Sequence, residues 1–213
     1  MVRSFVLAAA LVAAGIGPLD GFHSAGAQDA AAQCASALWL EPLTAAAGTA
    51  EATPAEAGES APAWTTAELT DACSGQSFSL ADFAGKTVYV EAMATWCPPC
   101  RDQLARVKEA AAQIPEEERG DIVFVALSSE VDLPRESLAA YAEDNGFPFV
   151  FAVMPAEMLR AMADDLGQEI AVPPATPHLI VAADGTVGEL HTGSAAPEEI
   201  LALLAETRAT PGS

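Results

Sequence analysis

Positive charge is scarce in this chain of 213 residues, which holds 9 Lys and Arg against 30 Asp and Glu and has a formal net charge of −21. Nucleic acids and anionic membrane surfaces are negatively charged, so binding to either would bring like charges together. The composition therefore argues against both as partners and favours solubility.

Long hydrophobic runs are also lacking. The apolar segment 5–17 is shorter than the roughly 20 residues of a membrane-spanning helix. It follows Arg3 and precedes Ala25-Gly26-Ala27, small residues in an A-x-A arrangement. This order is typical of a secretory signal peptide, and we expect cleavage after Ala27. The alternative is an uncleaved signal that tethers the protein to a membrane.

Aromatic residues are missing from residues 44–62, which consist mainly of Ala, Thr, Glu, Gly, Ser and Pro. Such a stretch cannot bury enough apolar surface to offset chain entropy, so we expect a flexible linker. We therefore divide the chain into a signal peptide (1–27), an N-terminal segment with linker (28–63) and a folded domain (64–213). A mature chain of 213 − 27 = 186 residues suits one such domain.

Cysteine is rare as well, and the four present are Cys34, Cys73, Cys97 and Cys100. Cys97 follows the β-rich run 88–93 and begins a helical pattern, so free N–H groups and the helix dipole favour a thiolate there. We expect an accessible Cys97 sulfur that attacks a disulfide, while Cys100 releases the product. A zinc site, which needs a second pair of ligands, and an inert structural disulfide are the alternatives.

The residues around this motif resemble the thioredoxin superfamily. The resemblance is carried by Trp96-Cys97-Pro98-Pro99-Cys100 after a hydrophobic strand, by the run 78–86, and by Ala94-Thr95. Over about residues 64–206 the chain is similar to the TlpA-like/ResA-like branch. The resemblance implies an α/β fold, a thioredoxin-like three-layer α/β/α sandwich with a mixed central sheet, and a redox role. We expect no cofactor and no bound metal.

The rest of the sequence alternates between strand and helix patterns, as in an α/β protein with a mixed sheet. We expect strands over 77–80, 88–93, 121–127, 149–153, 178–182 and 187–191, the last two joined by Asp184-Gly185. We expect helices over 98–113, 137–145, 155–166 and 197–206.

Glu91 is an acidic residue inside an apolar strand, six residues before Cys97. A buried carboxylate without a partner is costly, so its pKa rises or it serves a task. Its position matches the buried acid of thioredoxins, which implies that Glu91 accepts the proton of Cys100. In the alternative, Glu91 lies on a polar edge and pairs with Lys86 or an arginine.

Two prolines follow Cys97 and are expected to tune its redox behaviour. Pro98 has no N–H to offer a neighbouring thiolate, so we expect Cys97 to be less acidic than in a strong oxidant, which favours a reductant. Pro99 resembles the proline that precedes the second cysteine in many relatives.

Three residues are expected to contact substrate. In the superfamily the proline at Pro177 is cis and the backbone before it pairs with an extended substrate, which implies a cis Pro177 and a substrate contact at Thr176. An ordinary trans proline is the alternative. We expect Trp96 to form an apolar wall of the site, with plain core packing as the alternative.

Cys34 and Cys73 could close a second disulfide across 73 − 34 = 39 residues, worth about 4 kcal/mol in the loop-entropy model. Two free thiols are the alternative. A copper site made of His178, His191 and Met93 is a further alternative reading of the chain.

Together these features predict an exported, periplasmic thiol–disulfide oxidoreductase that reduces protein disulfides. The resemblance implies substrates such as apocytochrome c or copper-site proteins and a membrane thiol electron donor. We expect a monomer. The alternatives are a disulfide oxidase or isomerase of folding proteins and a copper-binding chaperone.

Overall fold

The computed structural model describes residues 61–209. The predicted signal peptide, most of the predicted linker and Cys34 lie outside these residues, so the predicted segment boundaries remain predictions. Within residues 61–209, no helix combines the length and the apolar character that crossing a membrane requires.

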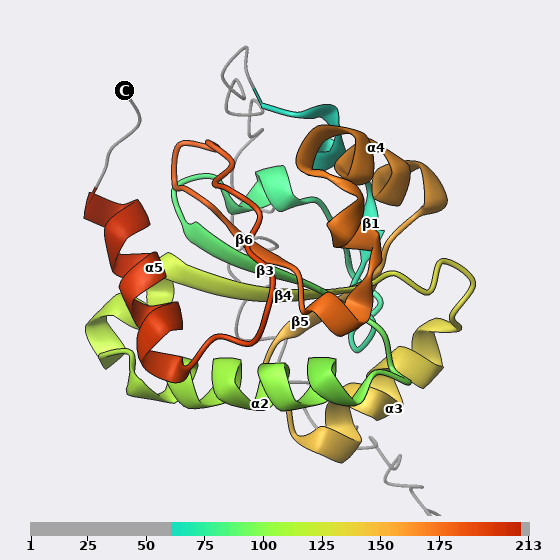
Figure 1. The fold of residues 1–213 in the computed structure, drawn as a ribbon, viewed down its shortest axis with the longest axis horizontal. Helices are drawn as coiled ribbons and strands as arrows, with labels where there is room; N and C mark the ends of the chain where they lie inside the picture. The colour runs from blue at the N-terminus through green and yellow to red at the C-terminus, as the bar shows by residue number, and fades with distance from the viewer. Residues whose placement is uncertain (1–60, 210–213) are drawn as a thin grey trace, which may run out of the picture. The chain divides into compact units, whose positions relative to one another are not determined.

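A mixed four-stranded sheet with the order β5-β4-β3-β6 forms the centre of the fold (Figure 1). Its strands are β3 (Thr87–Met93), β4 (Ile122–Ser128), β5 (Val150–Val153) and β6 (His178–Val181). β3 and β4 are parallel, as are β4 and β5, whereas β6 runs antiparallel to β3. Every residue of β3 and β4 is buried, because both faces of the sheet are covered.

Helices cover both faces (Figure 1). The helices are α2 (Pro98–Gln113), α3 (Arg135–Asn145), α4 (Ala156–Leu166) and α5 (Pro197–Ala209). Tyr89 and Met93 of β3 pack in one apolar cluster with α2, α3 and α5, whereas Val88 and Val90 pack in another with α4. The period-2 alternation of a strand thus divides the core into two layers. The predicted three-layer α/β/α sandwich with a mixed sheet is confirmed.

A second, two-stranded sheet precedes the main one. It pairs β1 (Leu69–Thr70) with β2 (Ser77–Phe78). The predicted strand 77–80 stops at Phe78 because the 3₁₀ helix η2 (Leu80–Phe83) begins directly afterwards. Ser79 and Asp82 close a capping box there, in which each side chain bonds the other residue's backbone N–H.

Within residues 61–209, four other 3₁₀ helices accompany the main elements. They are η1 (Ala63–Thr66), η3 (Glu116–Asp121), η4 (Gln168–Ala171) and η5 (Pro173–Ala175). Of these, η5 contacts α2 and lies directly before Thr176 and β6. It therefore brings a distant part of the chain to the helix that begins at the cysteine pair.

The predicted strand 187–191 is wrong. This segment makes only two isolated bridges to β6, Val181 with Val187 and His178 with His191. In a continuous antiparallel ladder that contains the His178–His191 pair, Val181 would face Gly188. It pairs with Val187 instead. The register therefore shifts by one residue between the two bridges, and no continuous ladder forms. Between them, the Gly188 N–H donates to the Ile180 carbonyl at 2.8 Å.

Candidate active site

The cysteine pair lies at the start of α2, just after the turn that connects β3 to this helix. After Met93 the chain makes a turn in which the Cys97 N–H donates to the Ala94 carbonyl at 3.1 Å. Cys97 is the N-cap of α2, and prolines occupy the first positions of the helix, where a missing N–H costs nothing. Cys97 and Cys100 form a disulfide with their Cα atoms 5.3 Å apart.

Both cysteines are buried in this disulfide form. Cys97 is 1% exposed and Cys100 0%, and both belong to the apolar cluster on the α2 face. The accessible Cys97 sulfur was expected of the reduced protein, so this expectation remains a prediction, while the oxidised form keeps the sulfur buried.

Hydrogen bonds distinguish the two sulfur atoms. The Cys100 N–H donates to the Cys97 Sγ at 3.2 Å, and Pro98 and Pro99 have no N–H to add. The Cys100 Sγ lies 3.1 Å from the Pro173 carbonyl oxygen. In the reduced protein that oxygen would accept a hydrogen bond from the Cys100 thiol and so favour its neutral form. The pattern favours Cys97 as the ionised sulfur and Cys100 as the thiol.

Glu91 is buried, 1% exposed, in the middle of the sheet between Ala126 of β4 and His178 of β6. The alternative of a polar edge paired with Lys86 is therefore wrong, and the Lys86 Nζ donates to the Gly120 carbonyl instead. Glu91 lies at i+2 from Tyr89, on the face of β3 that α2 covers.

The surroundings of Glu91 favour its neutral form. Its Oε2 accepts a hydrogen bond from the Tyr89 hydroxyl at 3.3 Å, and its Oε1 has no partner within residues 61–209. Burial raises the pKa of Glu91 well above its ordinary value, and the bond from Tyr89 offsets part of this rise. A carboxyl group with a pKa nearer that of a thiol exchanges a proton with it more readily.

Sequence reasoning missed two polar residues beside Glu91. Burial and the neighbouring Glu91 charge raise the pKa of Tyr89, while the Gln103 side chain lowers it. The buried Gln103 Oε1 accepts a hydrogen bond from the Ala195 N–H at 3.0 Å and so ties α2 to the segment before α5. Both could have been found from spacing, because Tyr89 shares a strand face with Glu91 and Gln103 lies three residues after Cys100 on α2.

The prediction of a cis Pro177 is wrong, because residues 61–209 contain no cis peptide bond. The chain turns instead at Thr176, whose φ of 47° is left-handed. The Thr176 N–H donates to the Pro173 carbonyl at 2.8 Å, and its own carbonyl accepts from the His178 Nδ1 at 2.9 Å. Both backbone groups are thus bonded within the chain; a substrate would have to displace the N–H bond, whereas the carbonyl has a second lone pair to offer.

Trp96 is 62% exposed, so the alternative of plain core packing is wrong. Val131 and Val172 are the other large apolar side chains exposed in the described part of the chain. They lie in the loop after β4 and just before η5, at the end of the sheet where Cys97 follows β3. The three exposed apolar side chains thus lie at the end of the sheet that carries the cysteine pair.

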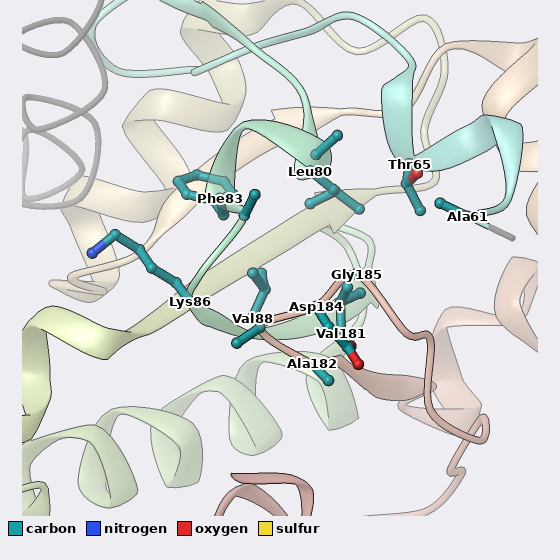
Figure 2. A pocket seen from close by; sticks show the side chains of 13 residues that line it. Ala61, Thr65, Leu80, Phe83, Lys86, Val88, Val181, Ala182, Asp184 and Gly185 are labelled. Carbon is teal, nitrogen blue, oxygen red and sulfur yellow. The ribbon is translucent and has the colours of Figure 1, made fainter. Parts of the chain in front are cut away.

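Away from this end, a hollow of about 240 Å³ opens between η2 and the turn after β6 (Figure 2). Its walls are mainly apolar and include Leu80, Phe83, Val88 and Val181. Val88 lies near the start of β3, whereas Cys97 lies beyond its end. The hollow is therefore separate from the cysteine site.

Only one cysteine of the second predicted disulfide lies within the described residues. Cys73 is disulfide-bonded, but Cys34 lies outside the described residues, so their pairing remains a prediction. His178 and His191 stack with ring centroids 5.6 Å apart, while Met93 is fully buried. Residues 61–209 hold no group of three or more His, Cys, Asp and Glu side chains placed to bind a metal ion.

A two-cysteine disulfide at a helix N-terminus, at one end of a mixed sheet in an α/β/α sandwich, defines the class of a thiol–disulfide oxidoreductase. The chain belongs to the Redoxin family, which matches residues 56–204. Family and site together identify an enzyme that exchanges thiols and disulfides and acts on protein substrates. No curated protein matches the chain.

Solved structures share the fold at low sequence identity. A thiol:disulfide interchange protein of the thioredoxin family from Chlorobium tepidum is 21% identical, with a TM-score of 0.51 over 67% of this chain and 95% of its own. A candidate electron transfer protein from Aquifex aeolicus is 13% identical, with a TM-score of 0.56 over 68% and 96%. A secreted disulfide oxidoreductase from Mycobacterium tuberculosis is 18% identical, with a TM-score of 0.49 over 67% and 97%. The first two confirm the thioredoxin-like fold.

Proposed function

We propose that this enzyme is an exported reductase of protein disulfides that works through the dithiol of Cys97 and Cys100. One observation carries the proposal: the disulfide begins α2, and the buried carboxyl group of Glu91 lies on the sheet face that α2 covers. A sulfur pair with a proton acceptor beneath it can run both half-reactions of disulfide exchange.

In the first step the Cys97 thiolate attacks one sulfur of the substrate disulfide. A mixed disulfide forms between Cys97 and the substrate, the substrate S–S bond breaks, and its second sulfur leaves as a thiolate. The Cys100 N–H, 3.2 Å from the Cys97 Sγ in the oxidised form, is placed to stabilise the starting thiolate.

In the second step Cys100 attacks the Cys97 sulfur, the mixed disulfide breaks, and the substrate leaves as a dithiol. The Cys100 thiol must first lose its proton, and we assign the acceptor role to Glu91. The substrate gains two electrons and two protons, and the protein is left with its Cys97–Cys100 disulfide. A membrane thiol donor would restore the dithiol by the same exchange in reverse.

Substrate contact is assigned to Trp96, Thr176 and Pro177. The exposed Trp96 ring offers apolar area beside the sulfur pair. Thr176 and Pro177 lie just before β6 at the same end of the sheet and are buried in the oxidised form, so a substrate would reach them only after local rearrangement. Pro98 and Pro99 keep N–H groups away from Cys97, which we expect to leave its thiolate less stabilised and the protein a reductant.

Export is proposed from the order of the N-terminal sequence: one arginine, an apolar segment and Ala25-Gly26-Ala27. It places the protein in the periplasm, where a structural Cys34–Cys73 disulfide would persist beside the catalytic pair. The mature protein, a monomer beginning after Ala27, would serve maturation of cytochrome c or copper-site proteins. An uncleaved signal would instead tether the same domain to the membrane.

Trapping with Cys100→Ser tests the proposal. Without the resolving thiol, the mixed disulfide on Cys97 should persist on a non-reducing gel, and mass spectrometry would identify the captured protein. The double variant Cys97→Ser/Cys100→Ser is the control and should capture nothing. If Cys100→Ser traps no substrate from an extract of the exported fraction and none from a model disulfide peptide, the proposed role of Cys97 is wrong.

Equilibration with glutathione separates the reductase from a disulfide oxidase or isomerase. A reductase keeps its disulfide at glutathione ratios that leave an oxidase reduced. Equimolar copper added to the reduced protein separates the copper chaperone, which alone would bind the metal stoichiometrically.

A further inference from the structure

A carboxylate holds the turn that leads into Cys97. The Thr95 N–H donates to the Glu130 Oε2 at 2.6 Å, and the Thr95 hydroxyl lies 2.9 Å from Oε2 and 3.2 Å from Oε1. Thr95 and Trp96 are the two central residues of the turn closed by the bond from the Cys97 N–H to the Ala94 carbonyl. Glu130 therefore hydrogen-bonds to this turn at Thr95, two residues before the reactive cysteine.

The loop that carries Glu130 is itself fixed to the end of β3. The Ser129 N–H and hydroxyl both donate to the Met93 carbonyl, at 2.9 and 3.3 Å. The Glu130 N–H donates to the hydroxyl of the buried Ser128 at 3.2 Å. The carboxylate thus has a defined position, and bonds from an N–H and a hydroxyl to a charged oxygen are among the stronger hydrogen bonds in proteins.

We propose that Glu130 is a positioning residue of the disulfide-exchange reaction, which orients the Ala94–Cys97 turn and opposes a second negative charge on the Cys97 sulfur. The inference rests on the proposed role of Cys97 as nucleophile. It gives a physical source, additional to the two prolines, for a poorly stabilised thiolate and hence for reducing behaviour.

Other titratable groups lie at this end of the sheet as well, and Glu130 is the one that hydrogen-bonds the turn directly. Arg101 and Asp102 are exposed neighbours near the start of α2 and are opposite in sign. Burial raises the pKa of Glu91, which favours its neutral form. Asp132 is exposed on the same loop as Glu130, where water screens its charge. On α3, burial raises the pKa of Tyr141 to about 12 despite the opposing Arg101 charge, so this hydroxyl is uncharged at neutral pH.

The test is to titrate the Cys97 thiolate in the Cys100→Ser protein, by absorbance and by the pH dependence of alkylation. Glu130→Gln removes the charge and keeps one acceptor oxygen, so the Cys97 pKa should fall by about half a unit to one unit. In the protein with both cysteines, the reduced form should be favoured about three- to tenfold in equilibrium with glutathione. A merely structural role would change stability and leave the titration unmoved.

Two further variants sharpen the result. Glu130→Asp keeps the charge but draws it back from Thr95, so the Cys97 pKa should fall in the same direction and by less. Glu117→Gln removes an exposed carboxylate from η3, beyond the far end of α2, and should change nothing. If Glu130→Gln does not fold, the test rests on whether the Cys97 pKa decreases in Glu130→Asp.

Two results would overturn the inference: a Cys97 pKa that Glu130→Gln leaves unchanged in the Cys100→Ser protein, or a larger decrease of that pKa in Glu130→Asp than in Glu130→Gln. The Cys100→Ser protein with Glu130 intact supplies the separate check on the proposed function. If Cys97 in Cys100→Ser neither titrates nor forms a mixed disulfide, the nucleophile assignment fails. If it does both and Glu130→Gln matches it, only the role of Glu130 is lost.

Discussion

At the scale of single residues, Glu91 should impose a pH dependence on stability. Its pKa in the folded protein is raised above the ordinary 4.5 by burial. Between these two pKa values the folded state holds a proton that the unfolded state has released, so stability falls as pH rises, by about 1.4 kcal/mol per pH unit. Below 4.5 both states are protonated and the effect vanishes.

Glu91→Gln should therefore stabilise the oxidised protein near neutral pH and leave it close to wild type at about pH 4. The measurement is the free energy of unfolding in urea between these two pH values. The exposed Glu109→Gln on α2 is the control and should follow wild type throughout. A stability difference between Glu91→Gln and wild type that is the same at every pH would show that Glu91 does not titrate as proposed.

The same substitution should slow the release of substrate, because glutamine cannot accept the Cys100 proton. Rapid-quench kinetics should show the mixed disulfide on Cys97 accumulating in Glu91→Gln, with its formation unchanged. The pH profile of substrate reduction should lose the limb that Glu91 contributes. Equal release rates in the two proteins across neutral pH would remove the proton-acceptor role.

At the scale of elements, α3 ends at Gly146, which has φ of 60° and ψ of 40°. The Phe147 N–H donates to the Ala142 carbonyl and the Gly146 N–H to the Glu143 carbonyl, at 3.0 and 2.9 Å. A side chain is disfavoured in this left-handed conformation, so Gly146→Ala should cost about 1 kcal/mol of unfolding free energy. Gly120→Ala has open space and no positive φ, and should be neutral by the same thermal melt.

The sequence predicts elements well where their ends are marked chemically. The bounds of α2 match the prediction at both ends because Pro98 and Pro99 open the helix and Pro115 follows it closely. The segment 187–191 shows the opposite case. It follows a hairpin turn at Asp184-Gly185, but a one-residue shift in register, which the sequence does not reveal, breaks the ladder.

The candidate site divides in the same way. Cys97, Cys100 and Glu91 were predictable because the motif and the buried acid lie within ten residues of one another along the chain. Glu130 was not, because it meets Thr95 across 35 positions and only the parallel pairing of β3 with β4 brings them together. Burial of Cys97 also escaped prediction, since it depends on side chains gathered from α2, β3 and other elements.

At the scale of the whole molecule, the net charge of −21 should affect which substrates arrive at the site. A charged protein attracts ions of opposite sign over roughly a Debye length, about 8 Å at physiological salt. The apolar surface of Trp96, Val131 and Val172 gives no preference for charge by itself. A preference for basic substrates would therefore come from the field of the whole chain.

We expect the reduced enzyme to attack a disulfide peptide flanked by lysines faster than the same peptide flanked by glutamates. The ratio of second-order rate constants should be about tenfold or more at low salt and should shrink as salt rises to physiological strength. Raising salt slows attack on the lysine peptide and speeds attack on the glutamate peptide, because screening removes attraction in one case and repulsion in the other. Stopped-flow fluorescence with matched peptides, their disulfide loop unchanged, measures both rates. Peptides that respond alike to salt would show that local contacts at the cysteine pair, rather than total charge, govern encounter.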